Sequence, residues 1–365
     1  MRIVHLLDWA SPGAAPVANA ALARQAIRRR PDLEHIVVAL GPSAARRLAA
    51  EAGLPAPIVH IAPPTGKLAL AGPAVARAVR ACARTDVLHA WSAPAASVAR
   101  RICPPGARAC ATILLRAADR ARPLRLRAAP PLHALVTPCA EAADRARTAR
   151  SAAHVVEVPA PRLDEAHPPG DRAALRQALG LGPDDRAALL VGDAVDDDAV
   201  RFIIACALTG ASGRPLCALL GRSAAPRRRT MRCFERTRAL LSCRVCDVDW
   251  LALAPAADIG LVVCRPDDAC RGTAAAALSL ACGLSAGLPV VAPEQIYQRL
   301  GLGRSEAGAL IAAGWTRAEL ARIAGPLVDD PPAARAAAAA AAAAQRPGSA
   351  FFDAIDEAWA GTIRS

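Results

Sequence analysis

Aromatic residues and lysine are scarce in this sequence of 365 residues. Phe, Trp and Tyr make up 3% of the chain, and Lys67 is the one lysine among 45 basic residues. Proteins that hold single-stranded nucleic acid without sequence preference stack its bases on aromatic side chains set in a basic groove. No stretch of this chain alternates aromatic and basic residues, so we expect no nucleic-acid partner.

Long apolar runs are also missing. About five apolar residues precede Asp8, fewer than the core of a secretory signal peptide needs. No stretch approaches the roughly 18 uninterrupted apolar residues of a membrane span. We therefore expect a cytoplasmic protein.

The 12 cysteines do not indicate disulfides or a metal centre. They are scattered through a long chain, which favours reduced core thiols over the disulfide framework of a small secreted domain. Cys243 and Cys246 form a CxxC pair, but no second pair and no nearby histidine completes the four ligands of a structural zinc site. We expect neither a metal nor a cofactor.

Positive charge is concentrated in the first part of the chain. Residues 1–160 contain 22 Lys and Arg against 9 Asp and Glu, whereas residues 161–365 contain 23 of each. The first part should therefore attract an anionic partner. This partner would be either the anionic inner face of the membrane or a phosphorylated small molecule. The best candidate for this contact is RAADRARPLRLR, residues 116–127, which carries five arginines beginning with Arg116. A solvated loop is the alternative.

Short aliphatic and β-branched runs alternate with Ala-, Arg- and Leu-rich stretches of helical length. This alternation predicts parallel, doubly wound α/β sheets. In the first part we expect strands at 2–7, 35–40, 58–61, 86–90, 110–115, 133–138 and 154–159. A Pro-, Asp- and Gly-rich passage follows at 159–171. The pattern then restarts, with expected strands at 187–192, 215–221, 258–263, 288–292 and 308–312.

Two tandem Rossmann-like domains account for this repetition. We expect a basic first domain at 1–160, a linker and first helix at 161–186, a second domain at 187–346 and a final helix at 347–365. The stretch 331–346 is Ala-rich and strongly helix-forming. In the final helix Phe352, Ile355 and Trp359 fall on one side, so that side needs a surface to dock on.

The loop after the first expected strand argues against a dinucleotide cofactor. A Rossmann dehydrogenase carries GxGxxG there, whereas this loop reads DWASPGAAP, with Gly13 as its one glycine. Doubly wound sheets bind ligands at the carboxyl ends of their strands, next to helix N-termini. Such a site in this chain should therefore serve a ligand other than NAD.

The order of motifs resembles the group 1, or family 4, retaining glycosyltransferases of GT-B fold over nearly the whole chain. MRIVHLLDWASPGAAPVANAALARQ is similar to the family's first strand, Gly-containing loop and first helix, and DVLHAWSAPAASVA to its DVVHAH strand and loop. ALVTPCAEAADRAR and VVEVPAPRLD are similar to its SE helix and VIPNGVD hinge. LLVGD, ALLGR, AADIGLVV and AGLPVVA then follow in the family's order, and the final helix resembles the one that crosses back to the first domain.

The resemblance implies two domains that face each other across a cleft, with a nucleotide-sugar donor held mainly by the second. It implies transfer of the sugar to a glycan, a lipid-linked or a small-molecule acceptor on the side of the first domain, without a required divalent metal. The donor-binding residues expected in this way are Gly13, Gly192, Arg222, Arg265, Arg271, Gly272 and Thr273.

Catalytic and acceptor-binding residues follow from the same resemblance. His89 matches the first histidine of the family's HAH motif, near the transferred sugar, although a histidine inside a strand can also be structural. Trp91 replaces the second histidine and would stack on an acceptor sugar or line the interface; Arg116 is the second expected acceptor contact. Asp267 or Asp268 could replace the first of two glutamates that hold the ribose and the sugar in the family.

The chain departs from the family at this donor site. Asp193 stands where the family has an arginine, and Asp196, Asp197 and Asp198 occupy the segment expected to carry a lysine. These acids suit a helix N-terminus but repel a diphosphate unless a metal intervenes. Three registers place the two glutamates on Ala274 and Cys282, on Arg271 and Ser279, or on Cys270 and Leu278; no acid occurs between Asp268 and Glu294.

These departures leave more than one function open. The first is an active glycosyltransferase in which arginines have taken over the diphosphate. The second is a protein of the same fold that no longer transfers sugar and serves as a binding or partner subunit. A sugar-nucleotide epimerase is a third function, but it needs acid and base side chains in the cleft, and the sequence places none there.

Overall fold

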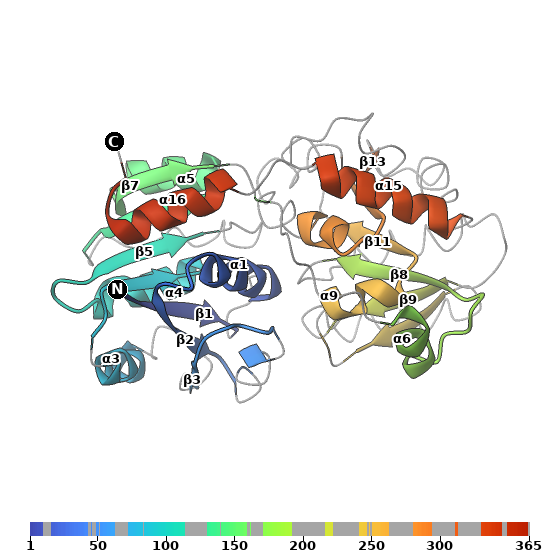
Figure 1. The fold of residues 1–365 in the computed structure, drawn as a ribbon, viewed down its shortest axis with the longest axis horizontal. Helices are drawn as coiled ribbons and strands as arrows, with labels where there is room; N and C mark the ends of the chain where they lie inside the picture. Colours follow the sequence, from blue (N-terminus) through green and yellow to red (C-terminus); the bar gives the residue numbers. More distant parts are fainter. Residues whose placement is uncertain are drawn as a thin grey trace. The chain divides into compact units, whose positions relative to one another are not determined.

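The structure is a computed structural model. It describes residues 1–9, 16–42, 45, 49–50, 52–62, 72–82, 84–113, 130–138, 140–158, 161, 171–191, 216–221, 241–246, 248, 250–262, 280–293, 311–312, 330–344 and 349–363. The chain divides into two compact units. Unit 1 comprises Met1–Pro161 with Gly348–Ser365, and unit 2 comprises Arg162–Pro347. Both are α/β units built on a sheet (Figure 1).

Unit 1 has a seven-stranded sheet in the order β3-β2-β1-β4-β5-β6-β7, and all its strand pairs are parallel. β1 to β3 form one half of the sheet and β4 to β7 form the other, so the strand order reverses between the neighbours β1 and β4. This is the topological switch point, where doubly wound sheets bind ligands. The strands are β1 (Arg2–Asp8), β2 (Glu34–Leu40), β3 (Ile58–Ile61), β4 (Val87–Ala90), β5 (Arg108–Thr112), β6 (Leu132–Thr137) and β7 (Ala152–Glu157).

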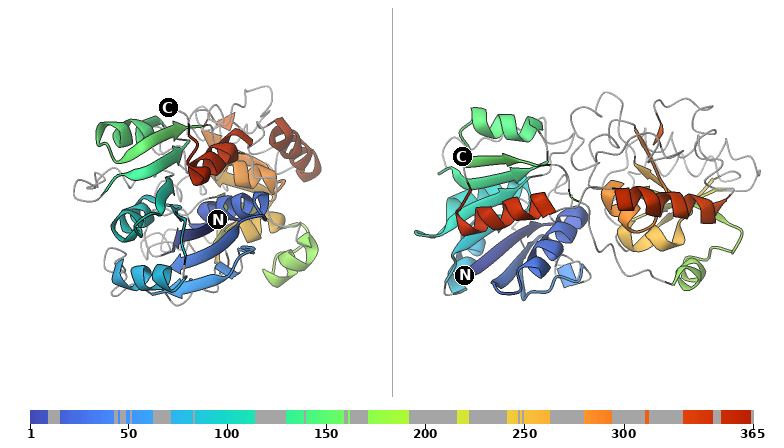
Figure 2. Two further views of the ribbon diagram at one scale, coloured as in Figure 1. Left: turned by 60° about the vertical axis from the view of Figure 1, so that its left-hand side comes forward. Right: turned by 45° about the horizontal axis from the view of Figure 1, so that its top comes forward.

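Helices cover this sheet, and the last of them comes from the end of the chain. They are α1 (Pro16–Arg29), α3 (Gly72–Ala81), α4 (Ala93–Ile102), α5 (Ala140–Thr148) and α16 (Ser349–Ala360). α16 packs on β5 and β6 and lies beside α1 (Figure 2). An Arg29–Asp353 ion pair of 2.6 Å joins it to α1, and Arg30, which directly follows α1, pairs with Asp356 at 3.9 Å. The expected apolar side of α16, with Phe352, Ile355 and Trp359, is buried, which confirms that prediction.

Unit 2 has a six-stranded sheet in the order β10-β9-β8-β11-β12-β13, again with parallel pairs. Every residue of β8 and β9 is buried, as expected for central strands covered on both faces. The strands are β8 (Arg186–Val191), β9 (Leu216–Leu220), β10 (Leu241–Val245), β11 (Ile259–Val262), β12 (Val290–Pro293) and β13 (Ile311–Ala312). The described helices are α6 (Arg172–Ala178), α9 (Trp250–Leu253), the 3-10 helix η5 (Ala254–Ala256) and α15 (Pro331–Ala344).

The α/β fold with parallel sheets confirms the sequence-based prediction, but β10 was missed. β10 reads LSCRV and is the edge strand of its sheet. Its described side chains are exposed or half-exposed, so it lacks the continuous apolar pattern that identifies a central strand.

The CxxC pair lies at this edge strand. Burial raises the pKa of the Cys243 thiol to about 12 and also raises the pKa of the Cys246 thiol. Within the ranges given above, no group of three or more His, Cys, Asp or Glu side chains could hold a metal ion. The helices in those ranges are all too short or too polar to cross a membrane.

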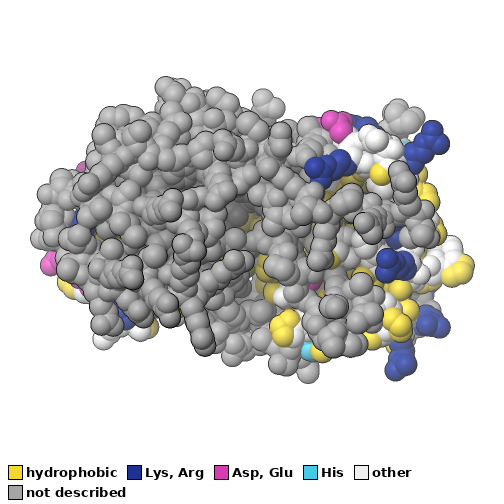
Figure 3. All heavy atoms as spheres, turned by 180° about the vertical axis from the view of Figure 1, so that it is seen from behind, with side chains coloured by type: hydrophobic (Ala, Val, Ile, Leu, Met, Phe, Trp, Pro, Cys, Tyr) yellow, Lys and Arg dark blue, Asp and Glu magenta, His cyan; other side chains and the backbone are white. Residues whose placement is uncertain are grey.

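Exposed arginines of unit 1 are spread over its described surface. Arg77 and Arg80 lie on α3, Arg101 on α4 and Arg147 on α5. Figure 3 shows basic side chains at several separate places on one face of the described part. The segment 116–127, which we expected to contact an anion, lies outside the described residues.

Candidate functional site

The candidate donor site is the carboxyl edge of the sheet in unit 2, at its switch point. β8 and β11 are neighbours there, and their last residues, Val191 and Val262, are partners in the strand pairing. Gly192 directly follows Val191 in the sequence, and the segment that follows Val262 contains Arg265 and Arg271. The fold therefore makes both segments begin at the edge where doubly wound sheets bind ligands.

β9 contributes a third segment to the same edge, and a close backbone contact fixes where it begins. Gly221 follows the last residue of β9 and precedes Arg222. A Cβ atom added to Gly221 would lie 2.4 Å from the backbone nitrogen of Trp250, the buried first residue of α9. No other residue fits at this position without a shift of the backbone, so the Gly221–Trp250 contact fixes the backbone at the end of β9.

The helical residues 280–285 pack an apolar surface against this sheet. Leu280, Ala281, Cys282 and Leu284 are fully buried. Cys282 is where one of the three registers places the family's second glutamate. A buried thiol is a weak donor and acceptor, so in this register the chain provides no group that could hold a ribose or sugar hydroxyl.

In unit 1, His89 lies in β4 and is fully buried. The indole Nε1 of Trp359 donates to Nδ1 of His89 at 2.8 Å, and Nε2 of His89 lies 3.1 Å from Oγ1 of Thr112. An indole nitrogen can only donate. Nδ1 is therefore the unprotonated nitrogen, and Nε2–H donates to the threonine. Burial lowers the pKa of His89 to about 3, so the ring is neutral at physiological pH.

Trp91 ends a second chain of hydrogen bonds in the same core. Its Nε1 donates to Nδ1 of His5 at 3.1 Å. Nε2 of His5 donates to Nδ1 of His35 at 3.0 Å, and Nε2 of His35 donates to the carbonyl oxygen of Arg30 at 2.9 Å. The indole at one end and the carbonyl at the other fix the direction of every bond. Burial lowers the pKa of His35 and, more strongly, that of His5, where His89 and His35 add to the effect.

We call His5, His35, His89, Trp91, Thr112 and Trp359 the histidine–tryptophan network. Neither His89 nor Trp91 has an exposed side chain. In this arrangement both ring nitrogens of His89 are hydrogen-bonded, and Trp91 has no exposed face on which a sugar could stack. The contacts favour the structural alternative for His89, and they place Trp91 in the core of unit 1. The expected roles of both residues in catalysis and acceptor binding stay predictions.

Two polar residues that the sequence analysis did not select lie at the switch point of unit 1. Asp8, the last residue of β1, is a buried carboxylate with 2% of its surface exposed. Ser92 follows β4 and caps α4, because its Oγ accepts from the backbone nitrogen of Ala95 at 3.2 Å. Asp8 could have been found as the acid that directly follows the expected strand at 2–7, and Ser92 as a typical N-cap residue before a proline-containing first turn.

The remaining expected site residues fall outside the part of the chain that the structure describes. Their roles therefore stay predictions. They are Gly13, Arg116, Gly192, Arg222, Arg265, Asp267, Asp268, Arg271, Gly272 and Thr273.

No protein-family model and no curated protein matches the sequence, but solved structures resemble its fold. Anabaena HepE, in complex with UDP and glucose, has a TM-score of 0.63 and 16% identity, with 99% of each chain covered. Sucrose-phosphate synthase of Thermosynechococcus elongatus has a TM-score of 0.61 and 14% identity, with 99% of this chain and 98% of the other covered. UDP-GlcNAc 2-epimerase of Neisseria meningitidis, bound to UDP-GlcNAc, has a TM-score of 0.56 and 11% identity, covering 98% of this chain and 99% of the other. At this identity the likeness shows the fold, and the chain has the GT-B fold.

Proposed function

We propose that the protein binds a nucleotide-sugar at the carboxyl edge of unit 2 and transfers the sugar to an acceptor. One observation carries the proposal: β8, β9 and β11 lie side by side in the sheet, and the segments with Gly192, Arg222, Arg265 and Arg271 begin at their carboxyl ends. When the sugar leaves, negative charge develops on the diphosphate, so cations placed at this edge lower the barrier. Arginines there would take the place of the arginine and the lysine that the resembling family has and that this chain lacks.

The comparisons support a uridine nucleotide as the first donor to test. HepE was solved with UDP and glucose and with UDP-glucose, and the Neisseria epimerase with UDP-GlcNAc. This chain covers at least 98% of each of these proteins. We infer that this chain takes a donor of the same chemical class.

The acceptor belongs, in this proposal, to the side of unit 1. Unit 1 contains the basic part of the sequence, and an anionic acceptor, either lipid-linked or phosphorylated, suits its charge. A glycan is the alternative acceptor. Transfer with retention of configuration and a cytoplasmic location, with peripheral contact to the inner face of the membrane, complete the proposal.

A second candidate function is a binding or partner subunit without turnover. The burial of Cys282 and the occupied ring nitrogens of His89 favour it. Both observations concern the groups that would have to act on the sugar, and neither concerns the diphosphate. A non-catalytic subunit should therefore still bind a nucleotide, but it should form no product.

The variants Arg222→Ala and Arg271→Ala test the proposal, with Arg101→Ala, an exposed arginine of unit 1, as the control. Each charged hydrogen bond to the diphosphate contributes about 1.5–3 kcal/mol, so each site variant should weaken nucleotide binding about tenfold or more. Calorimetric titration and a radiolabelled transfer assay measure binding and turnover separately. Unchanged affinity in both site variants contradicts the proposed site. Binding without product identifies the second function, and isomerised sugar in the absence of an acceptor identifies an epimerase.

A further inference from the structure

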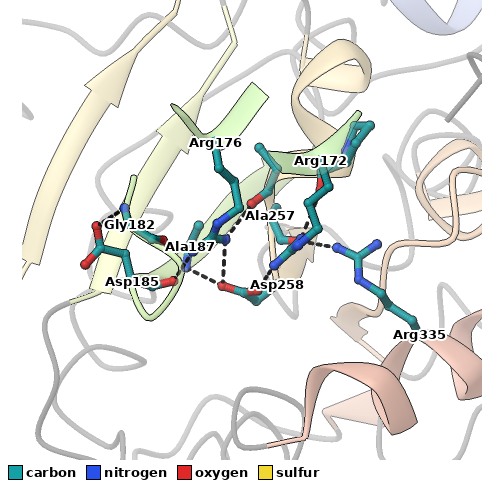
Figure 4. Close-up of polar contacts among 10 residues, drawn as sticks. Arg172, Arg176, Gly182, Asp185, Ala187, Ala257, Asp258 and Arg335 are labelled. Carbon is teal, nitrogen blue, oxygen red and sulfur yellow. Dashed lines mark hydrogen bonds and ion pairs between the residues drawn. The ribbon is translucent and has the colours of Figure 1, made fainter. Parts of the chain in front are cut away.

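Three arginines and one aspartate meet at the amino end of β8 and β11 in unit 2. This edge of the sheet is opposite the candidate donor site. Arg172 and Arg176 come from α6, Arg335 comes from α15, and Asp258 directly precedes β11 (Figure 4). Asp258 and Arg176 are 4% and 5% exposed, so the centre of this arginine cluster is shielded from water.

The carboxylate of Asp258 is already engaged on both oxygens. Oδ1 accepts from Nη2 of Arg172, and Oδ2 accepts from the backbone nitrogen of Ala187 at 2.7 Å and from Nη1 of Arg176 at 3.5 Å. These bonds leave Arg335 without a direct bond to the carboxylate. Among the described residues of this cluster, one negative charge therefore serves three guanidinium groups.

Backbone carbonyls accept further bonds from all three arginines. Arg176 donates to the carbonyl oxygens of Ala256, Gly182 and Asp185. Nη1 of Arg172 donates to the carbonyl oxygens of Pro255 and Ala257, at 2.9 and 2.8 Å. Nη2 of Arg335 donates to the same oxygen of Ala257. Because two guanidinium groups share this one oxygen, two like charges are held close together.

Arg335 is the least satisfied member of the cluster. Among the described contacts its guanidinium makes one hydrogen bond, although the group has five N–H donors. The side chain is half-buried, and burial together with the nearby charges of Arg172 and Arg176 lowers its pKa, against the opposing effect of Asp258. A partly buried excess of positive charge is stabilised when an anion compensates it.

We propose that Arg335 and Arg172 bind the phosphate group of a small soluble ligand at this edge of unit 2. A guanidinium matches two phosphate oxygens with two parallel N–H donors. A phosphate dianion also compensates the excess of two positive charges over the single carboxylate. The ligand would be inorganic phosphate or a phosphorylated sugar, and it would bind separately from the nucleotide at the carboxyl edge.

The full-length protein is titrated with inorganic phosphate and with glucose 6-phosphate at low ionic strength, with and without saturating UDP. We expect one phosphate site that survives saturation with UDP. Arg335→Gln should weaken it about tenfold or more, since a charged hydrogen-bond pair is lost. Arg335→Lys keeps the positive charge but loses the planar guanidinium with its paired N–H donors, so it should weaken phosphate binding less. Arg101→Gln, which removes one exposed charge from unit 1, should leave it unchanged.

Several results would overturn the proposal. One is equal phosphate affinity in Arg335→Gln and the unchanged protein, provided that circular dichroism shows both folded. Another is full competition by UDP, which would assign the phosphate to the donor site. If Arg335→Gln does not fold, equal phosphate affinity of Arg335→Lys and the unchanged protein would overturn the proposal. Loss of nucleotide binding alone would contradict the proposed function and leave this site standing.

Discussion

The indole nitrogen of Trp359 donates a hydrogen bond of 2.8 Å to Nδ1 of His89, which lies 270 positions earlier in the chain. This bond ties α16 to the middle of the sheet in unit 1. A second bond, from Nη2 of Arg108 to the carbonyl oxygen of Trp359, holds the end of the same helix. The C-terminal helix is therefore part of the folded core of unit 1.

Removal of this hydrogen bond should destabilise unit 1. Trp359→Phe keeps an aromatic ring but leaves Nδ1 of the buried His89 without its donor, and such a group costs about 1–3 kcal/mol. Urea denaturation, monitored by hydrogen exchange of the backbone amides in unit 1, measures the free energy of unfolding. In the His89→Leu background the same substitution should cost less, because the acceptor is gone. Equal costs in the two backgrounds would show that the bond contributes nothing.

Acid should destabilise unit 1 through its buried histidines. The folded-state pKa of His89 is about 3, below the ordinary value of 6.5, and the pKa values of His5 and His35 are lowered too. The unfolded chain therefore takes up protons first as the pH falls. The stability that depends on neutral His89 is fully present above about pH 6.5 and declines as the pH falls toward 3. At pH 5, protonation of His89 in the unfolded chain lowers the free energy of unfolding by about 2 kcal/mol.

Urea midpoints measured between pH 7.5 and pH 5 test this dependence. His89→Leu should be less stable at pH 7.5 but should lose less stability on acidification. If His89→Leu and the unchanged protein have the same pH dependence, His89 is not the group that titrates.

Loss of the aspartate in the arginine cluster should destabilise unit 2. Asp258→Asn keeps the size of the side chain but leaves the buried Arg176 without a negative partner, and breaking a buried ion pair costs about 3–5 kcal/mol. Asp144→Asn is the matched control, because Asp144 pairs with Arg147 in the open and an exposed pair contributes at most about 1 kcal/mol. Hydrogen exchange of α6 and β8 measures the effect of Asp258→Asn, and hydrogen exchange of α5 measures that of Asp144→Asn. Similar small effects would mean that the cluster does not stabilise unit 2.

A methyl group at Gly221 should disturb the candidate donor site. The added Cβ would lie 2.4 Å from the backbone nitrogen of Trp250, and overpacking of this kind costs about 1–3 kcal/mol. The shift should also move the start of the Arg222 segment, so Gly221→Ala should bind nucleotide more weakly. Gly72→Ala places its Cβ in open space and serves as the control. Unchanged stability and affinity in Gly221→Ala would contradict this account of the β9 end.

Sequence patterns identified most strands because central strands of a parallel sheet are continuous apolar runs. The fully buried central strand β8, Arg186–Val191, was predicted at 187–192, and the buried face of α16 followed from its helical spacing. β10 was missed because it is an exposed edge strand whose Ser242 and Arg244 interrupt the apolar pattern. Local patterns could not foresee the partners of His89, since Thr112 and Trp359 come from other elements of the fold.

The candidate site was less predictable than the fold. The resemblance to a family selected His89 and Trp91 by their order in a motif, but order does not show whether a side chain points into the core. His5, on the neighbouring strand β1, packs against both rings, and Trp359, on α16, packs against His89. The arginines expected at the donor site depend on segments beyond the described strand ends, so their roles remain to be measured.

Calorimetric titration of the purified protein with UDP, UDP-glucose and UDP-GlcNAc, with and without Mg²⁺, shows whether the protein holds a nucleotide-sugar. We expect at least one of them to bind with a dissociation constant of about 1–100 μM, equivalent to a binding free energy of about 5–8 kcal/mol. Mg²⁺ should not be required. If Asp193 and Asp196 to Asp198 hold a metal that carries the diphosphate, binding will instead depend on Mg²⁺. No binding of any of the three at millimolar concentrations, nor of the matching GDP and ADP compounds, would contradict the claim that this fold holds a nucleotide-sugar.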